Sequence, residues 1–274
     1  MSLKNKKKIL IFSAIFLTLI FTFSVVQINK NEKENISQVN AKIAANTSKI
    51  EWGIKRGKNH EQPDLGTVNK QIMDKLGGIC LGNKEKPFVY LTFDMGYEGG
   101  YTEKILDVLK QNNVKATFFI TGHYLNTASD LVKRMIDEGH IVGNHTVNHK
   151  CMPELTEEQI KEEVMNLHTA VYEKFGYEMK YIRPPKGEYS EASIEYTNKL
   201  GYKTVMWSFA YDDWDNNKQG REEYGKAKIM DNIHNGAVLL LHGTSKDNAN
   251  ILDYCIKEIK NSGYEFKSLD EFEI

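Results

Sequence analysis

The chain has 274 residues, and its 36 basic and 37 acidic side chains give a formal net charge of −1. This balance argues against the broad positive surface that binds nucleic acid, so no nucleic-acid partner is expected. The content of 41% hydrophobic and 11% aromatic residues suffices for a core, and α/β barrels commonly reach this length. The three cysteines are widely spaced and form neither a disulfide framework nor a CxxC zinc pattern.

The chain begins with a lysine-rich stretch at 4–8 and an uncharged apolar run at 9–26. The run is about long enough to cross a bilayer as a helix, and the basic residues before it are expected to stay cytoplasmic. No small-residue cleavage site closes the run directly, which favours an uncleaved anchor over a cleaved signal peptide. Residues 1–28 are therefore expected to be a signal or membrane anchor. The catalytic domain would then be membrane-anchored or secreted, on the extracytoplasmic side.

The polar segment 29–50 lacks apolar periodicity and is expected to be a linker, whereas 51–87 carries apolar anchors and is expected to wrap around the main domain. From Phe88 onward, strand-like runs alternate with amphipathic segments. Strands are expected at 88–94, 115–121, 140–145, 181–185, 202–208 and 237–242, and a last edge strand at 264–272. Helices are expected at 102–113, 129–139, 156–175, 190–200, 222–234 and 247–261.

Local signals support several of these helix ends. Thr102 is the expected cap of its helix, Thr156 and Gln159 form a capping box, and Gly139 is expected just past the end of a helix. Strand–helix units repeated six or seven times predict a parallel sheet that closes into a barrel. The expected fold class is therefore α/β.

Ionisable side chains of catalytic type stand where the predicted strands end. In parallel barrels, functional residues collect at the carboxyl ends of the strands, so these side chains are expected on one rim. They are Asp94, His145, Arg183, Asp213 and His242.

The segment "HTVNH" places His145 and His149 four residues apart. On one helical turn, this spacing would aim both imidazoles at a single point, as two metal ligands require. A pair of surface or capping histidines is the alternative, but the position at a strand end favours metal ligation. Zinc, cobalt, nickel and manganese all bind imidazole, so the two histidines do not choose among them.

The remaining rim residues suit hydrolysis by a water molecule that a metal activates. Asp94 is the candidate for taking the proton of the water, and His242, with a reference pKa of ~6.5, for protonating the leaving group. Asp213 or its competitor Asp212 would orient His242, and Arg183 would pair with Asp94 and hold it ionised. The alternatives are a turn residue for Asp213, a backbone-satisfied strand end for His242, and a solvent-facing Arg183.

The segment "RPPKGEY" constrains its own backbone. The two prolines force extended geometry at Arg183 and Pro184, and Gly187 permits a tight bend. The amide of Lys186 would thus sit in a rigid loop, where it is a candidate donor to an oxyanion.

In order, the motifs "TFDMG", "HTVNH", "RPPKG", "DDW" and "LLLLH" resemble those of the polysaccharide deacetylases of carbohydrate esterase family 4. The resemblance implies a distorted (β/α) barrel of the NodB-homology type over 88–274, and metal-dependent hydrolysis of a sugar N-acetyl group. The segments "EWGIKRGK", "RPPKGEYS" and "LLLHGTSKDNA" are similar to the PdaA-type branch, which acts on N-acetylmuramic acid in peptidoglycan.

For that branch, the freed amine closes into muramic δ-lactam in the spore cortex, which implies sporulation and peptidoglycan glycan strands as partner. The resemblance implies a divalent metal, with zinc expected and cobalt, manganese or nickel as alternatives, and a monomer that acts after an amidase. It gives Asp94 the role of base, His145 and His149 those of metal ligands, and His242 that of acid. Arg183 would orient the base. Asp213 would partner the acid, Trp214 and Leu239 would wall the acetyl pocket, and Lys186 would contact substrate.

One position departs from the family pattern. Met95 stands where most members have a second aspartate as metal ligand, and a thioether is a poor ligand for such ions. Metal binding is therefore expected to be weaker unless Asp94 or Glu98 supplies an oxygen. The alternatives are a chitooligosaccharide or N-acetylglucosamine deacetylase, an O-acetyl esterase, and a catalytically weakened wall-binding protein.

Overall fold

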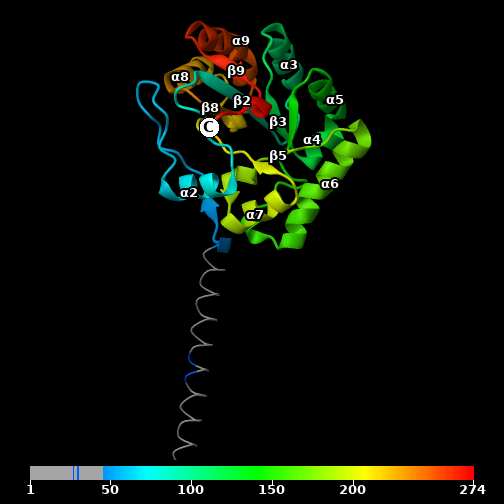
Figure 1. Ribbon diagram of the computed structural model, residues 1–274. Coiled ribbons are helices and arrows are strands. Elements are labelled where there is room, and N and C mark those ends of the chain that lie inside the picture. Colours follow the sequence, from blue (N-terminus) through cyan, green and yellow to red (C-terminus); the bar gives the residue numbers. More distant parts are fainter. Residues whose placement is uncertain (1–26, 28–29, 31–45) are drawn as a thin grey trace, which may run out of the picture. The chain divides into compact units, whose positions relative to one another are not determined.

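The computed structural model describes residues 27, 30 and 46–274, and Lys49–Ile274 forms one compact unit (Figure 1). The predicted anchor at 1–28 and the linker up to residue 45 lie outside the described residues, apart from 27 and 30. Within the part that is described, no helix is both long and apolar enough to span a membrane. Ile50 already belongs to β1 (Ile50–Glu51), which pairs with β6 (Glu188–Tyr189), so the folded unit begins slightly before the expected boundary.

A parallel sheet forms the centre of this unit, and its main strand order over the described residues is β7-β5-β4-β3-β2-β8. Its strands are β2 (Phe88–Met95), β3 (Thr117–Ile120), β4 (Ile141–Asn144), β5 (Tyr181–Ile182), β7 (Lys203–Thr204), β8 (Ala237–His242) and β9 (Glu265–Lys267). The last strand expected at 264–272 is present as the shorter β9, and β2 is the one strand with which it pairs among the described residues. It finds room there because β3 pairs with β2 only from Thr92 onward.

The segment after β7 closes the sheet into a distorted barrel. The amide of Val205 donates to the carbonyl of Ile182 at 2.8 Å, next to β5. A few residues later, the amide of Leu240 in β8 donates to the carbonyl of Phe209 at 2.9 Å. The segment that follows β7 thus turns away from β5 and runs to β8. For this reason the strand expected at 202–208 pairs with β5 only near its start. The predicted α/β class is confirmed, with a curled parallel sheet whose two ends are bridged by this segment.

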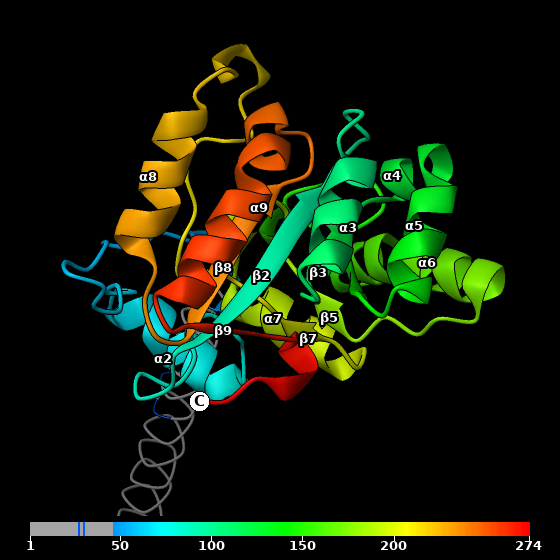
Figure 2. The ribbon, with the colours of Figure 1, turned by 90° about the horizontal axis from the view of Figure 1, so that it is seen from above.

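Helices cover the outside of the sheet, and in Figure 2 the neighbouring helices α3 and α9 appear on either side of β2. The helices are α2 (Thr67–Leu76), α3 (Thr102–Gln111), α4 (Gly122–Thr127), α5 (Ser129–Asp137), α6 (Glu157–Phe175), α7 (Glu191–Lys199), α8 (Glu222–Asn232) and α9 (Lys246–Asn261). Short 3₁₀ turns are η1 (Met152–Glu154), η2 (Pro185–Gly187), η3 (Asn216–Lys218) and η4 (Leu269–Glu271).

The helix ends follow most of the local signals. The capping box of Thr156 and Gln159 is present, and Gly139 follows α5 with a φ of 74°. The cap predicted at Thr102 was wrong, since Thr102 is the first helical residue and its side chain is buried. Its hydroxyl donates instead to Oε2 of Glu98 at 2.5 Å.

Strand alternation in β2 decides which side chains face the helices. Leu91, Phe93 and Met95 pack into the apolar cluster between the sheet and the helices. Tyr90 points the other way, into a smaller cluster inside the barrel. Asp94 has the same parity as Tyr90, so its carboxylate faces the interior at the carboxyl end of the barrel.

The segment 51–87 packs against α7 and the "RPPKG" turn. Trp52 joins α2 and α7 in a third apolar cluster, its indole N–H donates to the carbonyl of Trp207 at 2.9 Å, and its amide donates to the carbonyl of Gly187 at 2.9 Å. The bond to Gly187 ties the N-terminal segment to the "RPPKG" turn, and the bond to Trp207 ties it to the segment after β7.

Gly143 in β4 leaves room for Phe119, whose ring lies 4.3 Å from the guanidinium of Arg183. A Cβ at position 143 would lie 2.5 Å from Cδ1 of Phe119. Gly143→Ala is therefore expected to lower the free energy of unfolding by about 1–3 kcal/mol, the usual cost of overpacking. Urea denaturation measures this, and Gly53→Ala is the control because a Cβ there meets nothing within 4 Å. Equal midpoints for the two variants would contradict the prediction.

Candidate active site

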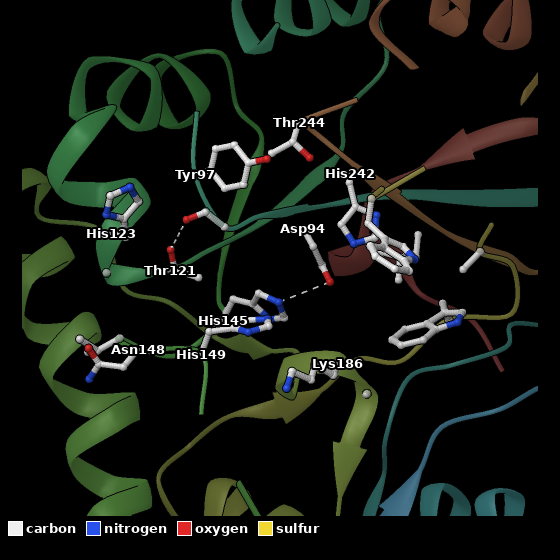
Figure 3. Close-up of a pocket in the computed structure, with 18 of the residues that line it drawn as sticks. Asp94, Tyr97, Thr121, His123, His145, Asn148, His149, Lys186, His242 and Thr244 are labelled. Atoms are coloured by element: carbon white, nitrogen blue, oxygen red, sulfur yellow. Dashed lines mark hydrogen bonds and ion pairs between the residues drawn. The ribbon is translucent and has the colours of Figure 1, made fainter. Parts of the chain in front are cut away.

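A cleft of about 1070 Å³ opens at the carboxyl ends of the strands. In Figure 3, Asp94 lies between His242 on one side and His145 on the other. Six of the nine predicted site residues line the cleft, namely Asp94, His145, His149, Lys186, Trp214 and His242. Arg183 and Asp213 lie behind the carboxylate and the imidazole that they were predicted to support.

Arg183 is fully buried and pairs with Asp94, as predicted, and the solvent-facing alternative is wrong. Its Nη1 donates to Oδ1 of Asp94 at 2.8 Å, and its Nη2 donates to the hydroxyl of Thr92 at 2.9 Å. Its Nε donates to the carbonyl of Val205 at 3.1 Å. The guanidinium is thus held on several sides, and it fixes one oxygen of the carboxylate while the other faces the cleft.

The charge state of Asp94 follows from this pairing. Burial alone would raise the pKa of Asp94, but the positive charge of Arg183, with smaller contributions from His145 and His242, brings the pKa below its ordinary value. Asp94 is therefore ionised at neutral pH and can accept a proton.

His242 and Asp213 form the second pair. Nδ1 of His242 lies 2.8 Å from Oδ1 of Asp213, and the backbone amide of His242 donates to Oδ2 at 2.8 Å. Asp212 bonds to Arg221 and Lys218 instead, so Asp213 is the residue that holds the imidazole. The turn-residue alternative for Asp213 is wrong.

Burial lowers the pKa of His242, but the carboxylate of Asp213, with help from Asp94, outweighs it and brings the pKa above its ordinary value. The bond at Nδ1 leaves Nε2 as the nitrogen that can serve the cleft. His242 therefore keeps a transferable proton to a higher pH than a free imidazole would.

The two histidines of "HTVNH" meet, but not on a helical turn, so that geometric expectation was wrong. They belong to the loop after β4, where Thr146 and His149 adopt left-handed φ values of 66° and 55°. The amide of Thr146 donates to Oδ1 of Asn144 at 2.8 Å, and the amide of His149 to the hydroxyl of Thr146 at 3.0 Å. This tight loop brings the ring centroids within 4.8 Å of each other.

Both imidazoles are suited to a metal. Nδ1 of His145 lies 2.8 Å from the carbonyl of Arg183, which leaves Nε2 free, the arrangement common for metal-binding histidines. Burial lowers the pKa of His145, and it lowers that of His149 to about 4, so both rings are neutral. Nε2 of His145 also lies 3.5 Å from Oδ2 of Asp94. The residues present therefore fit a divalent ion held by two imidazoles.

The third ligand is not evident. Among residues 46–274, together with 27 and 30, no group of three or more His, Cys, Asp and Glu side chains gathers as a metal site. Glu98, a candidate oxygen donor, is engaged elsewhere, because its Oε1 accepts the amide of Tyr101 at 3.0 Å and its Oε2 the hydroxyl of Tyr124 at 3.0 Å. Met95 is buried in the helix-side cluster and does not line the cleft.

Leu239 was assigned to the acetyl pocket, and this placement is wrong. Its side chain belongs to the apolar cluster beneath the helices, together with that of Leu241. Because side chains alternate along β8, Leu240 lies on the opposite face and lines the cleft. Trp214 does line the cleft, with 60% of its surface exposed.

The "RPPKG" turn has the expected backbone. Pro184 is extended, with a ψ of 134°, and Gly187 has a φ of 69°. Lys186 itself is left-handed, with a φ of 58°, and lines the cleft below the two histidines in Figure 3. The role of its amide as an oxyanion donor stays a prediction.

Several lining residues were missed, among them Tyr97, Thr121, His123, Asn148 and Thr244. Thr121 and His123 directly follow β3, so the strand-end rule applied to that strand would have found them. Leu240 was recoverable from strand alternation. Tyr97 follows β2 as Thr121 and His123 follow β3, and its hydroxyl accepts a hydrogen bond from Asn216 across the cleft rim.

Residues 81–205 match the polysaccharide deacetylase family. The chain is 48% identical over 229 residues to an uncharacterised protein of Geobacillus stearothermophilus (83% of this chain, 86% of that protein). It is 44% identical over 223 residues to the peptidoglycan-N-acetylmuramic acid deacetylase PdaA of Bacillus subtilis (81% and 85%). The solved structure of B. subtilis PdaA, a family 4 carbohydrate esterase, aligns with a TM-score of 0.81 at 44% identity (82% and 97%). A peptidoglycan-N-acetylglucosamine deacetylase of Bacillus cereus is 34% identical over 201 residues (72% of each). These matches confirm the resemblance that the five motifs indicate.

Proposed function

The chain belongs to the polysaccharide deacetylase family, hydrolases of amide bonds, and from that premise we propose that it removes the N-acetyl group of N-acetylmuramic acid in peptidoglycan. The higher identity to the muramic acid enzyme than to the N-acetylglucosamine enzyme supports this choice of sugar. The product carries a free amine beside the lactyl carboxyl, and closure of the two gives muramic δ-lactam.

One observation supports the proposal most directly: a proton acceptor and a proton donor face the same cleft from two sides. Asp94, with a lowered pKa, is ready to accept a proton, and His242, with a raised pKa, is ready to donate one. Amide hydrolysis needs both groups, because water must lose a proton and the leaving amine must gain one. The intact pairs also argue against a weakened wall-binding protein.

The steps follow from this arrangement. Asp94 takes a proton from the attacking water molecule while the oxygen of that water bonds to the carbonyl carbon of the acetyl group. The C–N bond then breaks, and His242 gives its proton to the nitrogen of the sugar. Acetate and a free amine are the products. Lys186 and Trp214, which line the cleft, are placed to contact the substrate.

His145 and His149 would hold a divalent ion, for which we propose zinc. Such an ion polarises a carbonyl oxygen and lowers the pKa of water when it is bound. Arg183 contributes from behind, because its carbonyl accepts the Nδ1 proton of His145 while its guanidinium holds Asp94. One residue thus sets the relative positions of the base and the first metal ligand.

The experiment is acetate release from peptidoglycan glycan strands freed of their peptides. We expect release by the full chain, its loss on treatment with a chelator, and its return when Zn²⁺ is added back. Release from chitooligosaccharides at a comparable rate would instead favour the alternative N-acetylglucosamine deacetylase. Activity that survives complete metal removal would contradict the metal dependence.

Replacement of Asp213 by asparagine is expected to move the alkaline limb of the kcat/KM profile to lower pH. The carboxylate raises the pKa of His242, and the neutral amide would not, so the imidazole would lose its proton earlier as the pH rises. Above the shifted limb, kcat/KM should fall about tenfold for each unit by which the pKa drops.

Asp212→Asn is the matched control for this variant, because Asp212 pairs with Arg221 and Lys218 and does not touch His242. Its alkaline limb should coincide with that of the wild type. If the limb of Asp213→Asn also stayed in place, His242 would not be the acid.

The cell-wall substrate implies that the catalytic domain acts outside the cytoplasm. We therefore propose that the N-terminal segment serves as an anchor or signal, and that the enzyme acts as a monomer in sporulation, after an amidase has removed the peptides. Fractionation of cells that produce the full chain tests the location.

A further inference from the structure

Glu163 is a buried carboxylate that neither proton-transfer pair uses. It lies on α6 with only 4% of its surface exposed, and a buried acidic side chain is stable only with partners. Its partners all come from the loop that carries the two histidines. The amide of Asn148 donates to Oε2 at 2.8 Å, Nδ2 of Asn148 donates to Oε1 at 2.8 Å, and Nζ of Lys150 lies 3.1 Å from Oε1.

The loop needs this support because its backbone is strained. Thr146 and His149 both have positive φ, and for a β-branched residue such as Thr146 this conformation is unusual. Strained conformations persist only where the surroundings fix them. Besides its carboxylate, Glu163 supplies its carbonyl, which accepts the amide of Val147 at 3.0 Å. One residue of α6 therefore holds the middle of the loop.

The two imidazoles differ in how they are held. The ring of His145 is fixed directly, by its Nδ1 contact with the carbonyl of Arg183. Within residues 46–274, no hydrogen bond reaches the ring of His149, which contacts the ring of His145 edge-on, and the hydrogen bond that holds His149 runs from its backbone amide to the hydroxyl of Thr146. The position of the His149 ring thus depends on the backbone of the loop, and the loop depends on Glu163.

We propose that Glu163 is the positioning residue for His149 and thereby sets the metal affinity of the site. This inference rests on the proposed metal-dependent function. The predicted route runs from the carboxylate of Glu163, through both donors of Asn148, to the backbone of His149. It assigns to α6 a role in the site although none of its side chains lines the cleft.

The test is a calorimetric titration of the metal-free full chain with Zn²⁺. Glu163→Gln keeps the size of the side chain, but its amide has one accepting oxygen in place of two, so it cannot accept the two N–H bonds of Asn148 at separate oxygens, and it carries no charge to pair with Lys150. We expect the dissociation constant for Zn²⁺ to rise about 10- to 100-fold, the usual range when a partner behind a ligand is lost. Glu162→Gln, the exposed neighbour, carries the same change of charge and should bind like the wild type.

A compensating change separates positioning from general stability. In the double variant Glu163→Gln with Asn148→Asp, the glutamine oxygen accepts the amide of residue 148 and its nitrogen donates to the new carboxylate. If the two substitutions acted independently, their separate effects on the affinity for Zn²⁺ would add in the double variant. We expect the double variant to bind Zn²⁺ more tightly than this sum predicts. Comparison with the sum also accounts for the negative charge that Asn148→Asp adds near the site. Urea denaturation of the metal-free proteins shows whether each variant is folded.

Each outcome decides the matter. Weaker binding by Glu163→Gln with positive coupling in the double variant supports the role of Glu163. Wild-type affinity in Glu163→Gln, or additive effects without coupling, overturns it while leaving the proposed function intact. A wild-type chain that binds no Zn²⁺ would contradict the metal dependence of the proposed function, and the inference with it.

Discussion

Asp94→Asn is expected to lower kcat/KM for acetate release by about 10²- to 10⁴-fold, the usual contribution of a positioned general base. The asparagine has nearly the same shape and can still accept the bond from Nη1 of Arg183, so the cleft should keep its form, although the buried guanidinium loses its counter-ion and the fold loses stability. It cannot take a proton from water, however. The loss should therefore appear in the chemical step and leave the alkaline limb of the pH profile, which belongs to His242, visible in the residual activity.

Asp107→Asn is the control, because Asp107 is exposed and pairs with Arg134 on the surface, away from the cleft. It should match the wild type in rate. A folded Asp94→Asn variant that kept more than a tenth of the wild-type rate would remove Asp94 from the role of base.

Arg183→Met should have the largest effect on stability. The substitution leaves the carboxylate of Asp94 buried without its partner, a change that typically costs roughly 3–5 kcal/mol. In the same step, the hydroxyl of Thr92 and the carbonyl of Val205 lose their donors. Urea denaturation at neutral pH measures the loss.

The pH dependence distinguishes lost charge pairing from lost packing. In the wild type, the folded pKa of Asp94 lies below its unfolded value, so its pairing stabilises above the unfolded pKa of ~3.9 and the effect disappears as the pH falls through the lowered pKa. In Arg183→Met, burial without the guanidinium raises the pKa of Asp94 in the folded state. Ionisation of Asp94 then lowers the free energy of unfolding as the pH rises. The deficit should thus be greatest near pH 7 and shrink toward pH 4.

A double-mutant cycle completes this test. Arg183→Met should cost less in a chain that already carries Asp94→Asn, since no charge is then left unpaired. An equal deficit at both pH values, with no coupling to position 94, would mean that Arg183 acts through packing alone.

Much of the site was predictable because parallel strands place their carboxyl ends together. The positions of Asp94, Arg183, Asp213 and His242 follow from the strand order, and the choice of Asp213 over Asp212 is settled by the bonds to His242. Local apolar periodicity located the helices for the same reason, since each buries one face against the sheet.

Side-chain direction and loop conformation were not predictable. Leu239 was chosen over Leu240 because an entirely apolar strand carries no polar alternation that would mark its faces. The spacing of "HTVNH" fits a helical turn, yet the backbone adopts left-handed φ values that depend on Glu163, a residue well separated along the chain. Met95 was considered only as a missing ligand, whereas strand parity buries it beneath the helices.

The central claim is that this cleft hydrolyses the acetamide of N-acetylmuramic acid. Its most direct test is mass spectrometry of peptide-free glycan strands, digested to disaccharides after incubation with the full chain or with Asp94→Asn. We predict the loss of one acetyl group from the muramic acid residue with the wild type and an unchanged spectrum with the variant. Loss confined to N-acetylglucosamine, loss of O-linked acetyl alone, or no loss at all would contradict the claim.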